Sequence, residues 1–311
     1  MAETRLVVTI ACVWAAGLLG TACAHRPPPT FRSTHLIVQR SGWGFRAFVR
    51  AKVAGQPMTL LLDTGAFRSI LPAGFVRAHG LPSRSANTDE RMVDANGNAA
   101  HMAFLPDVPV QFEGESSVGT LDFLMNSSED TAEGILVPQD IVRPGWVLVI
   151  DLEREELRYE LEESALKRLG GESPPLREVD FHRCLGEGPF ERAHRVVSTS
   201  INGVSADMLV DTGASRTFLA RNNPVLPSML SVQGSRETTV AITSRGQGLR
   251  VDDVSLLFSK TWFVLPVYVL PASMSCGKGA LGADVLRHCT LVWGWSSLWA
   301  ACHPPTESGG G

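Results

Sequence analysis

The chain has 311 residues, of which 44% are hydrophobic and 19% charged, and its formal net charge is −4. This composition excludes a disordered chain and provides core material for one large or two medium domains. The charge lacks the basic excess of nucleic-acid-binding domains, so we expect no nucleic-acid partner. Frequent glycine (29) and proline (19) between Val-, Thr- and Leu-rich runs favour an all-β protein with many turns.

The N-terminus has the pattern of a targeting segment. Arg5 precedes an apolar run over residues 6–20, which is short for a membrane span but suits a secretory signal. We expect a signal peptide over residues 1–24 and a Pro-rich spacer over residues 25–34. The segment also resembles a bacterial lipoprotein signal, in which Cys23 would be acylated. The protein is therefore expected in the bacterial cell envelope, periplasmic or lipid-anchored, with free secretion and an uncleaved anchor as alternatives.

Strands are predicted in the same order in the two halves of the chain. An N-terminal lobe is expected over residues 35–165, a Gly/Pro-rich linker over 166–180, a C-terminal lobe over 181–303 and a disordered tail over 304–311. The first lobe has predicted strands at 35–39, 48–53, 58–62, 92–95, 99–104, 121–125 and 134–136, a helical segment at 138–142, and a closing hairpin at 146–151 and 157–161. The second lobe has them at 195–201, 206–210, 238–242, 249–251 and 262–270, with 279–286 and the segment from 290 onward mirroring the end of the first lobe.

One motif occurs twice, at corresponding places in the two halves. Each copy is an apolar strand that ends in Asp-Thr-Gly-Ala, and the copies lie 148 residues apart. They are Asp63-Thr64-Gly65-Ala66 and Asp211-Thr212-Gly213-Ala214. A single Asp-Thr-Gly is usually only a turn, but two copies in register, each ending a strand, indicate a catalytic pair.

Two carboxyl groups within hydrogen-bonding distance can perform peptide hydrolysis. Like charges that close do not both ionise readily, so the pair holds one proton, and one group serves as base while the other serves as acid. Gly65 and Gly213 lack Cβ, which lets the two loops approach and an amide point at a carboxylate. The hydroxyls of Thr64 and Thr212 can bond across the lobe interface.

These motifs resemble the active-site motifs of retropepsin-like aspartic peptidases, here twice in one chain as in pepsin. Residues 279–284 are similar to the segment that supports the catalytic loop in that family, whereas Val137 stands in the first lobe where that segment has Gly. The resemblance implies a bilobal acid-protease fold of two β-barrel lobes with the cleft between them. It also implies flap hairpins around Asn96-Gly97 and Arg245-Gly246 and an aspartic endopeptidase that acts on polypeptides. No cofactor or metal is expected, and the chain should be monomeric because it supplies both lobes itself.

Other features leave alternatives open. Arg68 and Arg216 each lie five residues beyond an Asp, either as solvated side chains or as ligands for an acidic group of the substrate. Cys289 and Cys302 would face each other across a hairpin and can form a disulfide, while the pairing of Cys184 and Cys276 stays open. The alternative function is a non-catalytic peptide-binding or envelope-scaffold protein that keeps the fold.

Overall fold

The computed structural model describes residues 32–41, 44–85, 91–93, 99–113, 117–126, 133–184, 194–229, 235–240, 245–271, 273–274 and 276–305. The expected signal peptide, Cys23, most of the spacer, the tip of the Asn96-Gly97 hairpin and most of the tail lie outside these residues. Within them, no helix is both long and apolar enough to cross a membrane.

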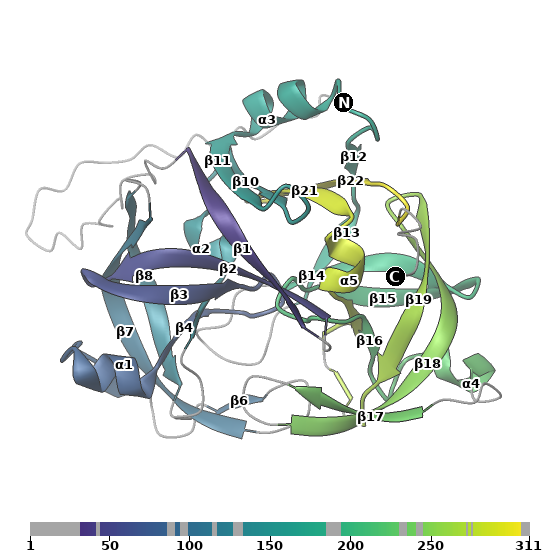
Figure 1. Ribbon diagram of the computed structural model, residues 1–311, viewed down its shortest axis with the longest axis horizontal. Coiled ribbons are helices and arrows are strands. Elements are labelled where there is room, and N and C mark those ends of the chain that lie inside the picture. Colours follow the sequence, from purple (N-terminus) through teal and green to yellow (C-terminus); the bar gives the residue numbers. More distant parts are fainter. Residues whose placement is uncertain are drawn as a thin grey trace, which may run out of the picture.

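The first lobe is a closed barrel of six strands (Figure 1). The pairing of β7 with β2, through Ala51 and Phe112, closes the ring. In order around the barrel the strands are β2 (Gly44–Val53), β3 (Gln56–Leu62), β9 (Gly134–Leu136), β4 (Ser69–Pro72), β8 (Ser117–Asn126) and β7 (Ala99–Phe112). Short β5 (Arg84–Ser85) and β6 (Arg91–Val93) pair with β7, and helices α1 (Ala73–Ala78) and α2 (Pro138–Ile141) follow β4 and β9.

The second lobe repeats this design. Pairing of β18 with β14, through Leu256 and Ile201, closes its ring. The strands in order are β14 (His194–Ile201), β15 (Val204–Val210), β20 (Gly279–Leu281), β16 (Phe218–Leu219), β19 (Thr261–Val269) and β18 (Arg245–Phe258). The remaining elements of this lobe are β13 (Phe181–Cys184), β17 (Ser235–Val240), α4 (Leu226–Met229) and α5 (Ala283–Leu286). The all-β bilobal prediction is confirmed.

An extension of the first-barrel sheet, continuous with it through the pairing of β1 (Ser33–Ser41) with β2, joins the lobes and is called the interlobe sheet here. It changes the interpretation of the predicted closing hairpin. Its strands run in the order β12 (Arg177–Glu178), β22 (Leu298–Cys302), β21 (Cys289–Gly294), β10 (Trp146–Asp151), β11 (Glu156–Leu161) and β1. Because β10 pairs with β21 of the second half as well as with β11, the hairpin does not close the first lobe but forms the centre of this interlobe sheet. The near-continuous burial of β10 is typical of a central strand.

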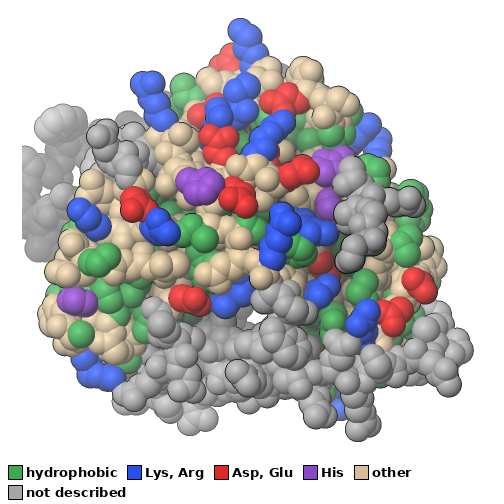
Figure 2. All heavy atoms as spheres, viewed as in Figure 1, with side chains coloured by type: hydrophobic (Ala, Val, Ile, Leu, Met, Phe, Trp, Pro, Cys, Tyr) green, Lys and Arg blue, Asp and Glu red, His purple; other side chains and the backbone are tan. Residues whose placement is uncertain are grey.

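The predicted linker also contains regular structure. Helix α3 (Glu162–Leu169) crosses the expected boundary at residue 165, and β12 adds an edge strand to the interlobe sheet. The helix carries acidic residues in its first turn and basic residues in its last, which suits its macrodipole, and it buries Ala165 and Leu169. On the face shown in Figure 2, basic and acidic side chains are interspersed over the upper part, where α3 and the interlobe sheet lie.

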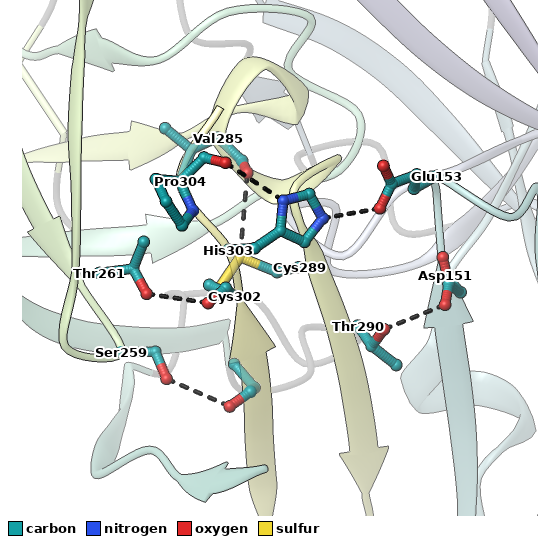
Figure 3. Close-up of a disulfide and its surroundings, with 11 residues drawn as sticks. Asp151, Glu153, Ser259, Thr261, Val285, Cys289, Thr290, Cys302, His303 and Pro304 are labelled. Atoms are coloured by element: carbon teal, nitrogen blue, oxygen red, sulfur yellow. Dashed lines mark hydrogen bonds and ion pairs between the residues drawn. A yellow bond between two sulfur atoms is a disulfide. The ribbon is translucent and has the colours of Figure 1, made fainter. Parts of the chain in front are cut away.

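Two disulfides stabilise the second half. Cys289 and Cys302 are bonded across the β21–β22 hairpin, as predicted, and Cys184 is bonded to Cys276. Around the first of these, Thr261 donates a hydrogen bond to the Cys302 carbonyl at 2.9 Å, and His303 lies 2.6 Å from a carboxylate oxygen of Glu153 (Figure 3). The hairpin thus connects the second barrel to the turn between β10 and β11.

Candidate active site

Both Asp-Thr-Gly loops begin where a buried strand ends. Strand β3 runs parallel to β9, and β15 runs parallel to β20. The amide of Asp63 donates to the Leu136 carbonyl at 3.0 Å, and that of Asp211 donates to the Leu281 carbonyl at 3.1 Å. Each Asp is therefore fixed at the carboxyl end of a strand pair in its own barrel.

Four hydrogen bonds between the two threonines and the opposite loops lock the lobes together. The Thr64 hydroxyl donates to the Val210 carbonyl at 2.8 Å and accepts from the Thr212 amide at 2.9 Å. The Thr212 hydroxyl does the same in reverse, donating to the Leu62 carbonyl at 2.7 Å and accepting from the Thr64 amide at 3.1 Å. Both side chains are fully buried, so each hydroxyl meets its hydrogen-bonding needs inside the interface. The predicted bonding across the interface is confirmed.

The two carboxyl groups face each other, and each is held by its own loop. Asp63 Oδ1 accepts from the amides of Gly65 and Ala66, both at 2.8 Å. Asp211 Oδ1 accepts from the amides of Gly213 and Ala214, both at 2.9 Å. Ionised carboxylates make such amide bonds stronger than neutral acceptors do, so each loop favours a charged group at its centre.

The glycines let each loop approach the other lobe's carboxyl group. A Cβ added to Gly65 would lie 2.2 Å from Cγ of Asp211, and one added to Gly213 would lie 2.2 Å from Cγ of Asp63. Any side chain at either position would displace the opposite carboxyl. The sequence prediction that these glycines permit close approach is therefore confirmed in both loops.

Burial and mutual proximity make simultaneous ionisation of the pair costly. Desolvation raises the pKa of Asp63, against the lowering effect of the Ala66 amide and of a hydrogen bond with Asp211. Desolvation, followed by the charge of Asp63, raises the pKa of Asp211 well above its usual value. Two such carboxyl groups titrate as a pair and hold one proton between them over a wide pH range.

A buried carboxylate behind the first loop supports it. The Ser69 hydroxyl and amide donate to Asp140 Oδ2 at 2.8 and 3.0 Å, and the same hydroxyl accepts from the Val137 amide at 3.0 Å. Arg68 lies 3.5 Å from Asp140 Oδ1, with a side chain only 14% exposed. Arg68 is therefore mostly buried and not a solvated side chain. Its guanidinium forms an ion pair with Asp140, the carboxylate that supports the loop.

The second loop has the same arrangement. The Thr217 hydroxyl donates to Asp284 Oδ1 at 2.7 Å and accepts from the Gly282 amide at 3.0 Å. Burial raises the pKa of Asp284, while hydrogen bonds from Thr217 and the charge of Arg216 act in the opposite direction. Arg216, like Arg68, thus acts electrostatically on the supporting carboxylate of its own lobe.

Val137 fits the position where the family pattern has glycine. Val137 and Gly282 both have extended backbone at the start of a short helix, with φ of −101° and −87°. A Cβ at Gly282 would lie 2.3 Å from the backbone carbon of Arg216, so only glycine fits there. Val137 is instead fully buried in an apolar cluster with Phe48 and Ile70. The local turn of the first lobe is retained.

The predicted flap hairpins are present as strand pairs, with one change of register. Strand β6 pairs with β7, with Met92 opposite Ala100, and the predicted turn at Asn96-Gly97 lies outside the described residues. In the second lobe Val240 pairs with Arg245, so Arg245 and Gly246 lie in strand β18 and not in the turn as predicted. The antiparallel ladder therefore extends further than the turn-forming residues indicate.

Sequence reasoning included Asp284 in the segment similar to the loop support of the family, but it assigned no role to Ser69, Thr217 or Asp140 and no individual role to Asp284. Ser69 and Thr217 are also 148 residues apart, so the repeat itself contained the first half of the signal. Asp140 and Asp284 do not share this spacing of 148 residues, so a comparison of the two halves at that spacing does not align them. An Asp in the first turn of the helix that follows each apolar-Gly segment is the pattern that would have found them.

Comparisons with known proteins agree with this geometry. Residues 49–136, which comprise most of the first barrel, match the family model described as "gag-polyprotein putative aspartyl protease". The structure resembles the crystal structure of an aspartic proteinase from Irpex lacteus with a TM-score of 0.51 and 12% identity, over 87% of this chain and 97% of that one. The chain has the aspartic-proteinase fold.

The resemblance to retropepsin-like and pepsin-like aspartic peptidases seen in the sequence is confirmed by these two findings. A comparison with curated protein sequences gives no match. Family model and aspartic-proteinase fold together support a role as a peptidase. Among the described residues, no group of three or more His, Cys, Asp or Glu side chains is arranged to hold a metal ion.

Proposed function

We propose that the chain is an aspartic endopeptidase in which Asp63 and Asp211, one from each lobe, form the catalytic pair. The observation that carries the proposal is the reciprocal approach of each carboxyl group to the glycine of the opposite loop. The proposal is also supported by the raised pKa of both acid groups, which follow the ends of strands β3 and β15.

The chemistry follows from the shared proton. The ionised carboxylate takes a proton from a water molecule as its oxygen attacks the carbonyl carbon of the scissile peptide bond. The protonated carboxyl gives its proton to the carbonyl oxygen, so a neutral tetrahedral diol forms. As the diol collapses, one of its hydroxyl groups returns a proton to the carboxylate that had protonated the carbonyl oxygen. The carbon–nitrogen bond breaks, and the proton first taken from water passes to the leaving amine, so a free acid, a free amine and the singly protonated pair remain.

The surrounding residues hold the pair in position for this reaction. The amides of Gly65, Ala66, Gly213 and Ala214 engage Oδ1 of each Asp, which directs the remaining oxygens towards the partner carboxyl and the substrate. The threonine network fixes the two loops, and Asp140 and Asp284 support them from behind. Such support matters because catalytic groups must be held within a fraction of an ångström of the productive geometry.

Cleavage-site profiling tests the proposal. The mature protein is incubated with a broad mixture of synthetic peptides from pH 3 to 8, and new termini are identified by mass spectrometry. Asp63→Asn and Asp211→Asn should each abolish cleavage while leaving the thermal unfolding transition in place. Asp180→Asn, at an exposed aspartate of the second half, is the matched control and should keep full activity. Cleavage by the wild type that survives both active-site substitutions would refute the assignment, and peptide binding without cleavage would favour a non-catalytic binding protein.

A further inference from the structure

Large apolar side chains are exposed at one end of the interlobe sheet. Leu161 at the end of β11 is 49% exposed, and Trp295 in the β21–β22 turn is 44% exposed. Trp146 pairs with Leu161, and its neighbour Val147 pairs with Gly294, so the strand ladder brings these positions together. A hydrogen bond of 2.5 Å from Ser297 to Glu162 connects the same turn to the start of α3. We refer to the exposed Leu161 and Trp295, together with the half-buried Trp146 that stacks on Tyr159, as the tether face.

The N-terminal segment enters the fold beside this face. Tyr159 donates its amide to the carbonyl of Arg32 at 2.9 Å, and Ser33 pairs with Arg158. Strands β1 and β11 are antiparallel, so Arg32, the first described residue, lies at the end of β11 that carries Leu161. Figure 1 shows β1 beginning next to β11 at the end of the molecule that carries α3.

The sequence before Arg32 contains the features of a membrane tether. Residues 6–20 form the apolar run, and Cys23 follows it within a stretch of small residues. The nine residues from Cys23 to Arg32 can span about 30 Å at most when fully extended. An anchor at Cys23, or in the apolar run, would therefore keep the tether face close to the bilayer.

We propose that the tether face lies against a lipid bilayer, with Trp295 and Leu161 inserted at the level of the headgroups. Tryptophan suits this position because its ring is apolar while its indole N–H can bond at the polar boundary. Arg183 donates to the backbone carbonyl of Trp295 at 2.9 Å, so a cation lies at the same turn. Two exposed side chains are too few for a stable protein–protein interface, which buries roughly 1,200 Å² or more.

This orientation has a consequence for access to the candidate active site. The hairpin strands β6 and β17 lie at the opposite end of the molecule from α3 and the interlobe sheet (Figure 1). With the tether face on the membrane, those hairpins point away from the bilayer, and substrates approach from the aqueous side. The inference concerns the surface alone and stands whether or not the carboxyl pair is catalytic.

Fluorescence quenching by brominated lipids tests the proposal. The full chain, in a Trp14→Phe background because Trp14 lies in the apolar run, is reconstituted into phosphatidylethanolamine/phosphatidylglycerol vesicles with and without brominated acyl chains. Trp295→Phe should remove about half or more of the lipid-dependent quenching, with Trp146 accounting for the rest. Trp262→Phe is the matched control: Trp262 is 53% exposed, but it lies on β19 of the second barrel, and its removal should leave the quenching unchanged.

Three results would overturn the inference. The first is equal quenching in the Trp295→Phe variant and its parent, and the second is an equal loss in Trp262→Phe. The third is failure of the full chain to sediment with vesicles. If Trp295→Phe instead converts a dimer to a monomer in detergent, the face contacts a second copy of the chain and not lipid. The thermal unfolding of each variant should match that of its parent, which shows that a change in quenching comes from the surface position of the tryptophan and not from a loss of folding.

Discussion

Replacing Gly65 by alanine tests the close approach of the two loops. The new Cβ would lie 2.2 Å from Cγ of Asp211 and 2.5 Å from each of its carboxyl oxygens. Ordinary contact begins near 3.4 Å, so the carboxyl group must retreat by about 1 Å. The backbone at Gly65 is not in the left-handed region, and the effect therefore comes from the contact alone.

The expected magnitude follows from what that retreat breaks. Asp211 Oδ1 accepts two amide hydrogen bonds of 2.9 Å, and bonds to a charged group contribute about 1.5–3 kcal/mol each. Overpacking of a dense interior costs about 1–3 kcal/mol. We expect the free energy of unfolding to fall by about 4 kcal/mol or more, which is the sum of the lower limits of these contributions. A displacement of about 1 Å at a reacting group lowers kcat/KM by about 100-fold or more.

The assay combines peptide cleavage with urea unfolding of the same preparations. Gly74→Ala is the matched control, because a Cβ at this helical position meets nothing within 4 Å. It should keep full activity and gain about 0.5–1 kcal/mol from the helix preference of alanine. The reasoning is refuted if Gly65→Ala cleaves peptides at the wild-type rate, or if Gly74→Ala loses as much activity.

Three further predictions concern the lobe interface, the disulfides and pH. Thr212→Val removes two hydrogen bonds across the interface and should cost about 2–4 kcal/mol in urea unfolding, whereas Thr212→Ser should restore most of it. Loss of the Cys184–Cys276 bond, which spans 92 residues, should destabilise by about 4.6 kcal/mol, against about 2.9 kcal/mol for the 13-residue bond between β21 and β22; equal losses would exclude a chain-entropy origin. Because the pKa of Asp211 is raised in the folded state, its contribution to stability is full below the unfolded value of 3.8 and declines as pH rises towards the folded pKa. Asp211→Asn should therefore gain thermal stability relative to wild type between pH 4 and 7, and a constant difference across that range would contradict the raised pKa.

The two Asp-Thr-Gly loops were predictable from sequence because each is short and local. A buried strand that ends in Asp-Thr-Gly specifies the position of the Asp, and the repeat in the second half supplies its partner. The close approach of Gly65 to Asp211 follows from the absence of a Cβ, which is a property of the residue itself.

The interlobe sheet was not predictable in the same way. Strand β10 reads as half of a local hairpin, and its pairing with β21 joins residues about 140 positions apart without a turn signal between them. The support by Asp140 and Asp284 likewise depends on contacts with Ser69 and Thr217 that lie about 70 residues away. Long-range pairings of this kind are set by packing of the complete fold. A local pattern, such as the Asp in the first turn of α2 and of α5, marks only one of the two partners and does not specify the other.

The central claim is that two carboxyl groups act as one unit, and the cleavage rates of three variants test it most directly. Asp63→Asn, Asp211→Asn and the double variant are compared with wild type on one peptide identified by profiling. Groups that share a single proton give non-additive losses, so each single variant should lose nearly all activity and the double variant should lose no more. Measurable cleavage by either single variant, with losses that multiply in the double variant, would contradict the account.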